Sequence, residues 1–265
     1  MICREVVLSG QAKMSTYFLD NFENLDPRRK RPVVLICPGG GYEKTSEREA
    51  EGVAVQLLAA GFHAAVLWYS VAPARFPQAL REAAAGVAWL REHGEEFHIR
   101  EDRVFLMGFS AGGHLAASLG VFWDQDFLAD LRKEKARELR PDGLLLCYPV
   151  IDFLQVPHEG SLQNLAGERK EELRARLSLE TQVGPQVPPA FLWHTQADNQ
   201  VPVKNSLLFY EALLEQGIPA ELHLFPRGGH GMALATAETA REQRHIQRES
   251  AQWMELAKNW IRAFD

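Results

Sequence analysis

The chain has 265 residues, of which 46% are hydrophobic and 24% are charged, and its formal net charge is −6 at pH 7. This length and composition predict one soluble globular domain that spans residues 1–265. The negative charge, without a basic stripe interleaved with aromatic residues, excludes a typical nucleic-acid-binding surface, and no apolar stretch approaches membrane-spanning length.

The sequence holds three cysteines, Cys3, Cys37 and Cys147, and their spacing matches neither a disulfide framework nor a zinc site. The N-terminus lacks the long apolar region of a secretion signal. Together these features predict a cytoplasmic protein. We expect neither a metal ion nor an organic cofactor, and assembly into a homo-oligomer is left open.

Strand-like and helix-like segments alternate along the chain, which predicts an α/β fold with a mostly parallel central sheet flanked by helices. The first segment, from Arg4 to Leu19, instead resembles an antiparallel hairpin at the sheet edge. The other expected strands fall at 33–37, 63–69, 103–107, 144–148, 190–194 and 221–225. The expected helices fall at about 46–61, 77–94, 113–119, 124–138, 204–216 and 253–264.

Two segments carry more specific predictions. The first expected helix begins at Ser46–Glu49, a capping-box pattern in which the glutamate would fold back onto the helix start. Residues 153–188 interrupt the alternation between two core strands, are polar, and contain one expected short helix near 168–177. We interpret this insertion as a small lid.

The strongest chemical signal is the G-x-S-x-G pattern of Gly108–Gly112, which lies between an expected strand and an expected helix. A serine on such a sharp turn projects its hydroxyl at the end of the sheet, where it can reach a substrate carbonyl. The pattern alone is short and needs partners, because a serine hydroxyl attacks an ester only when a base and a third, orienting group activate it. Ser110 is therefore a candidate nucleophile.

His230 is the best candidate for the base among the nine histidines. It lies in the glycine-rich segment Arg227–Gly231, directly after the last expected strand, where the backbone can turn the imidazole toward the serine. His114 is closer in sequence, but four residues along a helix it would lie below the exposed hydroxyl. We interpret His114 as a packing residue.

Asp198 is the best candidate for the orienting acid, because it follows a core strand and precedes His230 in the order serine, acid, histidine. Its carboxylate would hold the imidazole in the tautomer that accepts the serine proton. Asp152 also follows a core strand and remains the alternative acid.

Backbone N–H groups are expected to stabilise the oxyanion of an acyl-transfer reaction. The residue after the nucleophile, Ala111, supplies one, and Gly40 and Gly41 in the loop after strand 33–37 supply the others. A phosphate-binding interpretation of this glycine-rich loop fails, because no G-K-[ST] follows it. The aromatic residues that could wall the site, with core packing as the alternative, are Tyr42, Phe109 and Trp123.

These segments resemble the α/β-hydrolase superfamily over nearly the whole chain, and within it the bacterial acetyl esterases related to acetylxylan and other carbohydrate esterases. The resemblance implies a Ser110–Asp198–His230 triad. Two departures are visible: Pro38 stands where hormone-sensitive-lipase-like esterases have histidine, and Ala197 stands where relatives often have a second acid. The matching segments are 37–42, 69–73, 108–116, 191–195, 201–203 and 228–231.

The sequence therefore predicts a serine carboxylesterase that hydrolyses short-chain, mainly acetyl, esters through an acyl-enzyme. The expected substrate is a small-molecule ester or acetylated oligosaccharide, such as an acetylated sugar or short xylo-oligosaccharide. Two alternatives remain: a small peptidase of the prolyl-oligopeptidase type, which shares the D-x-x-V-P pattern of Asp198–Pro202, and a non-catalytic binding protein with a hydrolase fold.

Overall fold

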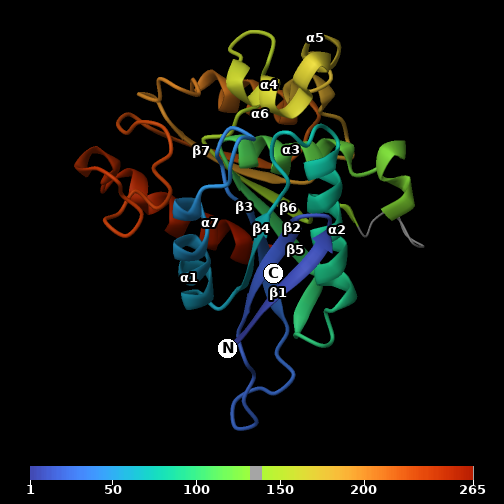
Figure 1. The fold of residues 1–265 in the computed structure, drawn as a ribbon. Helices are drawn as coiled ribbons and strands as arrows, with labels where there is room; N and C mark the ends of the chain where they lie inside the picture. Colours follow the sequence, from blue (N-terminus) through green and yellow to red (C-terminus); the bar gives the residue numbers. More distant parts are fainter. Residues whose placement is uncertain (132–138, 265) are drawn as a thin grey trace.

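The computed structural model describes residues 1–131 and 139–264. In this part of the chain the strands form one eight-stranded sheet in the order β1-β2-β4-β3-β5-β6-β7-β8 (Figure 1). The strands from β3 to β8 pair in parallel, as the sequence predicts. Their bounds are β3 (Arg31–Cys37), β4 (His63–Trp68), β5 (Ile99–Phe109), β6 (Gly143–Cys147), β7 (Ala190–Thr195) and β8 (Ala220–Phe225).

The predicted N-terminal hairpin is confirmed. β1 (Ile2–Ser9) pairs antiparallel with β2 (Ala12–Phe18), and β2 in turn pairs antiparallel with β4. Every second residue of β2 is buried, whereas β1 is partly buried or exposed along its length. β1 therefore forms one edge of the sheet.

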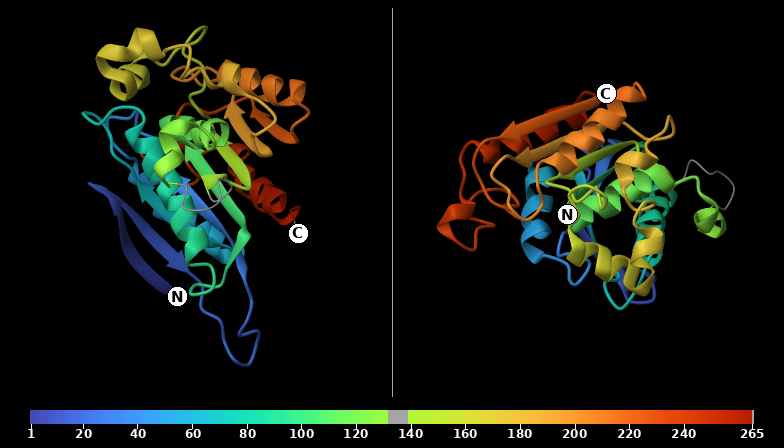
Figure 2. Two further views of the ribbon diagram at one scale, coloured as in Figure 1. Left: turned by 90° about the vertical axis from the view of Figure 1, so that its right-hand side faces the viewer. Right: turned by 90° about the horizontal axis from the view of Figure 1, so that it is seen from above.

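Helices cover both faces of the sheet and enclose two hydrophobic clusters (Figure 2). Residues of α2 (Gln78–Glu92), α3 (Ala111–Phe122) and α6 (Lys204–Glu215) belong to the first cluster. Residues of α1 (Glu51–Ala59) and α7 (Trp253–Arg262) belong to the second. Because both faces of the central strands are covered, β3 and β6 consist almost entirely of apolar residues.

Two helix predictions need correction. The amphipathic helix expected at 124–138 is a 3-10 helix, Asp126–Leu131, in its described part, and residues 132–138 lie outside the described residues. The insertion holds α5 (Lys170–Leu173) within the predicted segment, and it also holds α4 (Glu159–Ala166), for which the sequence predicts no helix. Gly160 and Asn164 lower the helix propensity of α4, and burial of its leucines against the core compensates for this.

The insertion lies over the end of the sheet opposite the N-terminus (Figure 1). The backbone of Phe76, in the loop after β4, donates a hydrogen bond to the Leu165 carbonyl of α4. The side chain of Asn164 donates to the carbonyl of Gly41, in the loop after β3. α4 therefore packs on loops that leave the carboxyl ends of the strands, which is where open α/β sheets bind ligands.

Candidate active site

Ser110 occupies the sharp turn between β5 and α3. Its backbone angles are φ 54° and ψ −119°, and residues other than glycine rarely adopt such a positive φ. The Ser110 N–H donates to the Cys147 carbonyl, and the Ser110 carbonyl accepts from the Val150 N–H. These bonds to the end of β6 and the loop that follows hold the strained residue in place, as is common for functional residues.

The glycines around Ser110 are required by close backbone contacts. A Cβ atom on Gly112 would lie 2.1 Å from the Cys37 carbonyl oxygen, and one on Gly108 would lie 2.1 Å from the Gly112 carbonyl oxygen. Only glycine allows α3 to begin this close to the ends of β3 and β5. The G-x-S-x-G pattern is thus a packing requirement of the turn that presents the serine.

His230 lies within hydrogen-bonding distance of both predicted partners. Its Nε2 is 2.7 Å from Ser110 Oγ, and its Nδ1 is 2.7 Å from Asp198 Oδ2. Since the Asp198 carboxylate can only accept hydrogen bonds, the proton between the two groups is on Nδ1. Nε2 then accepts the hydrogen bond from the serine hydroxyl. This is the tautomer that a general base needs.

Asp198 is held in the loop after β7. Its Oδ1 accepts hydrogen bonds of 3.0 Å from the N–H groups of Gln200 and Val201, and its Oδ2 accepts the hydrogen bond from His230 Nδ1. Burial alone would raise the pKa of this carboxyl, but hydrogen bonds from His194 and His230 outweigh burial and lower it. Asp198 is therefore ionised at neutral pH.

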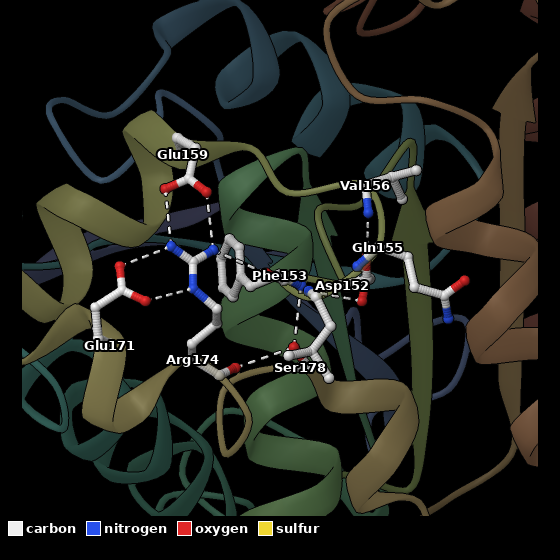
Figure 3. A network of polar contacts seen from close by, with 9 residues as sticks. Asp152, Phe153, Gln155, Val156, Glu159, Glu171, Arg174 and Ser178 are labelled. Carbon is white, nitrogen blue, oxygen red and sulfur yellow. Dashed lines mark hydrogen bonds and ion pairs between the residues drawn. The ribbon is translucent and has the colours of Figure 1, made fainter.

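The alternative acid, Asp152, is engaged elsewhere. Its fully buried carboxylate accepts hydrogen bonds from the N–H groups of Leu154, Gln155 and Val156 (Figure 3). It therefore caps the turn that starts the insertion, and Asp198 is the carboxylate that contacts His230.

The predicted oxyanion loop lies directly beside the nucleophile. A Cβ atom on Gly39 would lie 2.9 Å from the Cβ of Ser110. Gly40 has φ 134°, and a Cβ there would lie 2.2 Å from the Lys44 carbonyl oxygen, so this position requires glycine. Across the serine, Ala111 is the first residue of α3, where backbone N–H groups have no acceptor within the helix.

A buried glutamate supports this loop, a role that no sequence pattern indicated. Glu49 Oε2 accepts from the Gly39 N–H at 2.8 Å, and Oε1 accepts from the Tyr148 hydroxyl at 2.7 Å. The Tyr148 hydroxyl also accepts from the Ala233 N–H, and its ring meets the His230 ring edge-on with centroids 5.2 Å apart. One carboxylate thus links the oxyanion loop to the histidine loop.

The same contacts correct the predicted capping box at Ser46–Glu49. Ser46 makes no side-chain capping hydrogen bond, and the chain first forms a 3-10 turn, Glu47–Glu49. Glu49 turns into the interior because two buried donors, the Gly39 N–H and the Tyr148 hydroxyl, face it there. The S-x-x-E pattern is a local signal, and tertiary partners override it.

The three candidate wall residues do not line the site. Phe109 is fully buried and packs against Tyr148 and Trp253. Tyr42 is 2% exposed, and its hydroxyl bonds to His114 Nδ1. Trp123 lies at the far end of α3, about 20 Å from the nucleophile at 1.5 Å per residue, and donates to the Gln186 carbonyl.

His114 is a structural residue, as expected. It is fully buried, its Nε2–H donates to the Leu177 carbonyl, and its Nδ1 accepts from the Tyr42 hydroxyl. Burial lowers its pKa to about 4, so the imidazole is neutral near pH 7. These bonds tie α3 to the insertion and to the oxyanion loop.

Charged and polar contacts anchor the insertion itself (Figure 3). Arg174 forms ion pairs with Glu159 and Glu171, and it also donates to the Phe153 carbonyl. The backbone N–H of Phe153 donates to the Ser178 hydroxyl. Because these bonds join the turn at Asp152 to the segment around Arg174 and Ser178, they hold α4 and α5 together in this structure.

Glu180 predicts a pH-dependent stability of the insertion. Burial raises the pKa of this carboxyl from its ordinary value of 4.5 to about 8, and the neighbouring Asp152 carboxylate raises it as well. The folded state therefore keeps a proton that the unfolded state loses between pH 4.5 and 8. The stabilisation is complete below pH 4.5 and is lost as the pH rises to about 8.

Glu180→Gln removes this titration, so the variant should unfold at a higher temperature than the wild type at pH 8.5. At pH 5 the two proteins should unfold at similar temperatures. Thermal unfolding at both pH values measures the difference, with the exposed Glu168→Gln of the same insertion as the control. If Glu180→Gln changed the unfolding temperature by the same amount at both pH values, the raised pKa of Glu180 would be contradicted.

Across residues 1–131 and 139–264, no group of three or more histidine, cysteine, aspartate or glutamate side chains could hold a metal ion. Within the same residues, no helix combines the length and apolar character needed to cross a bilayer.

A serine on a strand-to-helix turn, joined to an aspartate and a histidine from later loops of a mostly parallel sheet, defines an α/β-hydrolase. Comparison with known proteins agrees with this class. The model of the BD-FAE family matches residues 19–213, and the chain belongs to that family.

Two solved structures are similar over nearly the whole chain. The acetyl ester-xyloside bifunctional hydrolase from Caldicellulosiruptor lactoaceticus is 36% identical, with a TM-score of 0.83 over 96% of this chain and 88% of that one. The carboxylesterase Cest-2923 from Lactobacillus plantarum is 29% identical, with a TM-score of 0.86 over 99% and 96%. Both confirm the fold.

Two curated relatives are longer proteins. Endo-1,4-beta-xylanase B from Butyrivibrio fibrisolvens is 37% identical over 215 residues, which cover 79% of this chain and 34% of the relative. The acetylxylan esterase from Xylanibacter ruminicola is 28% identical over 238 residues, which cover 86% and 45%. The chain therefore spans less than half the length of either relative.

Proposed function

We propose that this protein is a serine carboxylesterase that removes short acyl groups, principally acetyl, from sugars or short xylo-oligosaccharides. The observation that carries the proposal is the pair of 2.7 Å contacts that join Ser110, His230 and Asp198. The names of similar proteins support the substrate class, since they include an acetylxylan esterase and an acetyl ester-xyloside hydrolase. The unpaired cysteines support a cytoplasmic location.

In the proposed reaction, His230 Nε2 takes the hydroxyl proton of Ser110 while Oγ bonds to the ester carbonyl carbon. His230 then gives this proton to the alcohol oxygen as the carbon–oxygen bond breaks, which leaves an acyl-enzyme. Water attacks the acyl carbon and gives a proton to His230, which passes it to Ser110 Oγ as the bond between the acyl carbon and Oγ breaks; the carboxylic acid leaves and the serine hydroxyl is restored. Asp198 stabilises the imidazolium in both halves of the reaction.

The oxyanion that forms in both steps is proposed to accept hydrogen bonds from the backbone N–H groups of Gly40, Gly41 and Ala111. The Gly39 N–H donates to Glu49, so it serves the loop rather than the substrate. Losing one oxyanion donor typically costs about 3 kcal/mol of transition-state stabilisation. Glu49 is thus a supporting residue that fixes the loop in position.

Ester cleavage fits the carboxylates of the site better than glycoside cleavage, although one relative bears the name of a xylanase. Glycoside hydrolysis ordinarily uses two carboxyl groups that flank the glycosidic bond. The carboxylate of Asp198 accepts hydrogen bonds from groups of the protein on both of its oxygens, and so does that of Glu49. Neither is arranged to face a substrate.

Hydrolysis of the p-nitrophenyl esters of acetate, butyrate and octanoate tests the proposal. We expect kcat/KM to be highest for acetate and to fall with each increase in chain length. Cleavage of aminoacyl amides without cleavage of acetate would favour the peptidase alternative. No hydrolysis of either class would favour a binding protein and would contradict an esterase.

A further inference from the structure

His158 lies at the start of α4, and its ring has a defined orientation and tautomer. Its Nδ1 accepts a hydrogen bond from the Ser161 backbone N–H at 3.2 Å and lies 2.8 Å from the Ser161 hydroxyl. A nitrogen that accepts from a backbone N–H carries no proton, so the ring proton is on Nε2. The opposite edge of the ring therefore presents an N–H donor.

The same imidazole is uncharged near neutral pH. Burial lowers the pKa of His158, and the nearby His230 lowers it further, while Asp198 raises it. Burial is the largest of these effects, so the neutral form is favoured. A neutral ring with a fixed Nε2–H donor can bind a hydroxyl group without competing with His230 for the serine proton.

Two neighbours place His158 beside the reacting groups. On one side, Ser161 Oγ lies 3.9 Å from the position that a Cβ of Gly41 would occupy, so the first turn of α4 packs against the oxyanion loop. On the other side, the charges of His230 and Asp198 influence its pKa. The start of α4, which carries His158, thus lies beside the oxyanion loop, and it is close enough to His230 for the charges of the two rings to interact.

The segment that carries His158 is held at both ends. Asp152 caps the turn at Leu154–Val156 just before it, and Arg174 pairs with Glu159 just after it (Figure 3). A donor that is fixed before the substrate arrives loses little conformational entropy on binding.

We propose that His158 is a specificity residue that donates a hydrogen bond from Nε2 to a ring hydroxyl of the leaving sugar. The proposal rests on the esterase function proposed above and assigns the alcohol side of that site. The class of substrate it selects is an ester whose alcohol carries further hydroxyl groups. Ester hydrolysis as such does not require this hydrogen bond.

Two substrates of similar shape test this directly: a monoacetylated methyl β-D-xylopyranoside, and cyclohexyl acetate, whose ring lacks hydroxyls. The measured quantity is the ratio of their kcat/KM values. His158→Asn keeps an acceptor for the Ser161 N–H but has no donor at the Nε2 position, so this ratio should fall about five- to tenfold. His158→Gln extends an amide N–H toward that position, so it should restore most of the ratio.

The exposed Gln163 of α4 provides the matched control, and Gln163→Ala should leave the ratio as in the wild type. An unchanged ratio in His158→Asn, whether both rates fall together or neither changes, would overturn the proposal and leave His158 a purely structural cap. If the wild type hydrolyses neither ester, the esterase function itself fails, and the assignment of His158 fails with it.

Discussion

Replacing Ser110 with alanine is expected to lower kcat for p-nitrophenyl acetate by a factor on the order of 10⁴ to 10⁶. The change removes the only atom that can form the acyl-enzyme in the proposed mechanism, while His230 and Asp198 remain in place. Alanine fits the space of Ser110, whose strained backbone is held by the Cys147 carbonyl and the Val150 N–H. Steady-state kinetics and thermal unfolding of the purified variant measure both effects.

Ser118→Ala is the matched control, because Ser118 is also a buried serine and lies on α3. Its hydroxyl lies 3.4 Å from His114 Nδ1, away from the reacting groups. We expect its kcat to stay within a few-fold of the wild type. A Ser110→Ala variant that keeps more than about one percent of the wild-type kcat would show that another group is the nucleophile.

Asp198→Asn should lower kcat by about 10⁴, the loss expected when the orienting acid of such a triad becomes an amide. The amide oxygen can still accept from the Gln200 and Val201 N–H groups, so the loop keeps its shape. The amide nitrogen, however, faces His230 Nδ1 as a donor. The imidazole then favours the tautomer that cannot take a proton from Ser110.

Asp152→Asn distinguishes the two candidate acids. The carboxylate of Asp152 now accepts hydrogen bonds from the N–H groups of Gln155 and Val156. In the variant, the amide nitrogen, itself a donor, would face these two N–H groups. This variant should therefore unfold at a lower temperature but lose much less kcat than Asp198→Asn. The reverse order of kcat losses would show that Asp152 is the orienting acid.

Local sequence patterns predicted the core of this protein well. The positions of the parallel strands follow from continuous apolar runs such as 33–37, and the edge hairpin follows from residues 4–19. Ser110, Asp198 and His230 each lie in the turn or loop that follows a strand. Because the carboxyl ends of parallel strands meet at one edge of the sheet, residues far apart in sequence come together there, and these three lie in hydrogen-bonding contact.

The remaining features depend on tertiary contacts that a sequence pattern does not contain. Glu49 matches a capping box, but two donors from distant segments draw its carboxylate inward. Phe109 and Tyr42 flank glycine-rich turns, yet helices on both faces of the sheet bury them. α4 contains weak helix formers, and its packing on the oxyanion loop stabilises it.

The most direct test of the account is to identify the nucleophile by covalent labelling. The protein is incubated with a fluorophosphonate ester, digested, and analysed by mass spectrometry, while residual hydrolysis of p-nitrophenyl acetate is followed in parallel. We predict one phosphonyl group per chain, on the peptide that contains Ser110, with loss of activity in proportion to labelling. Labelling of a different residue, or full activity after Ser110 is labelled, would contradict the proposed mechanism.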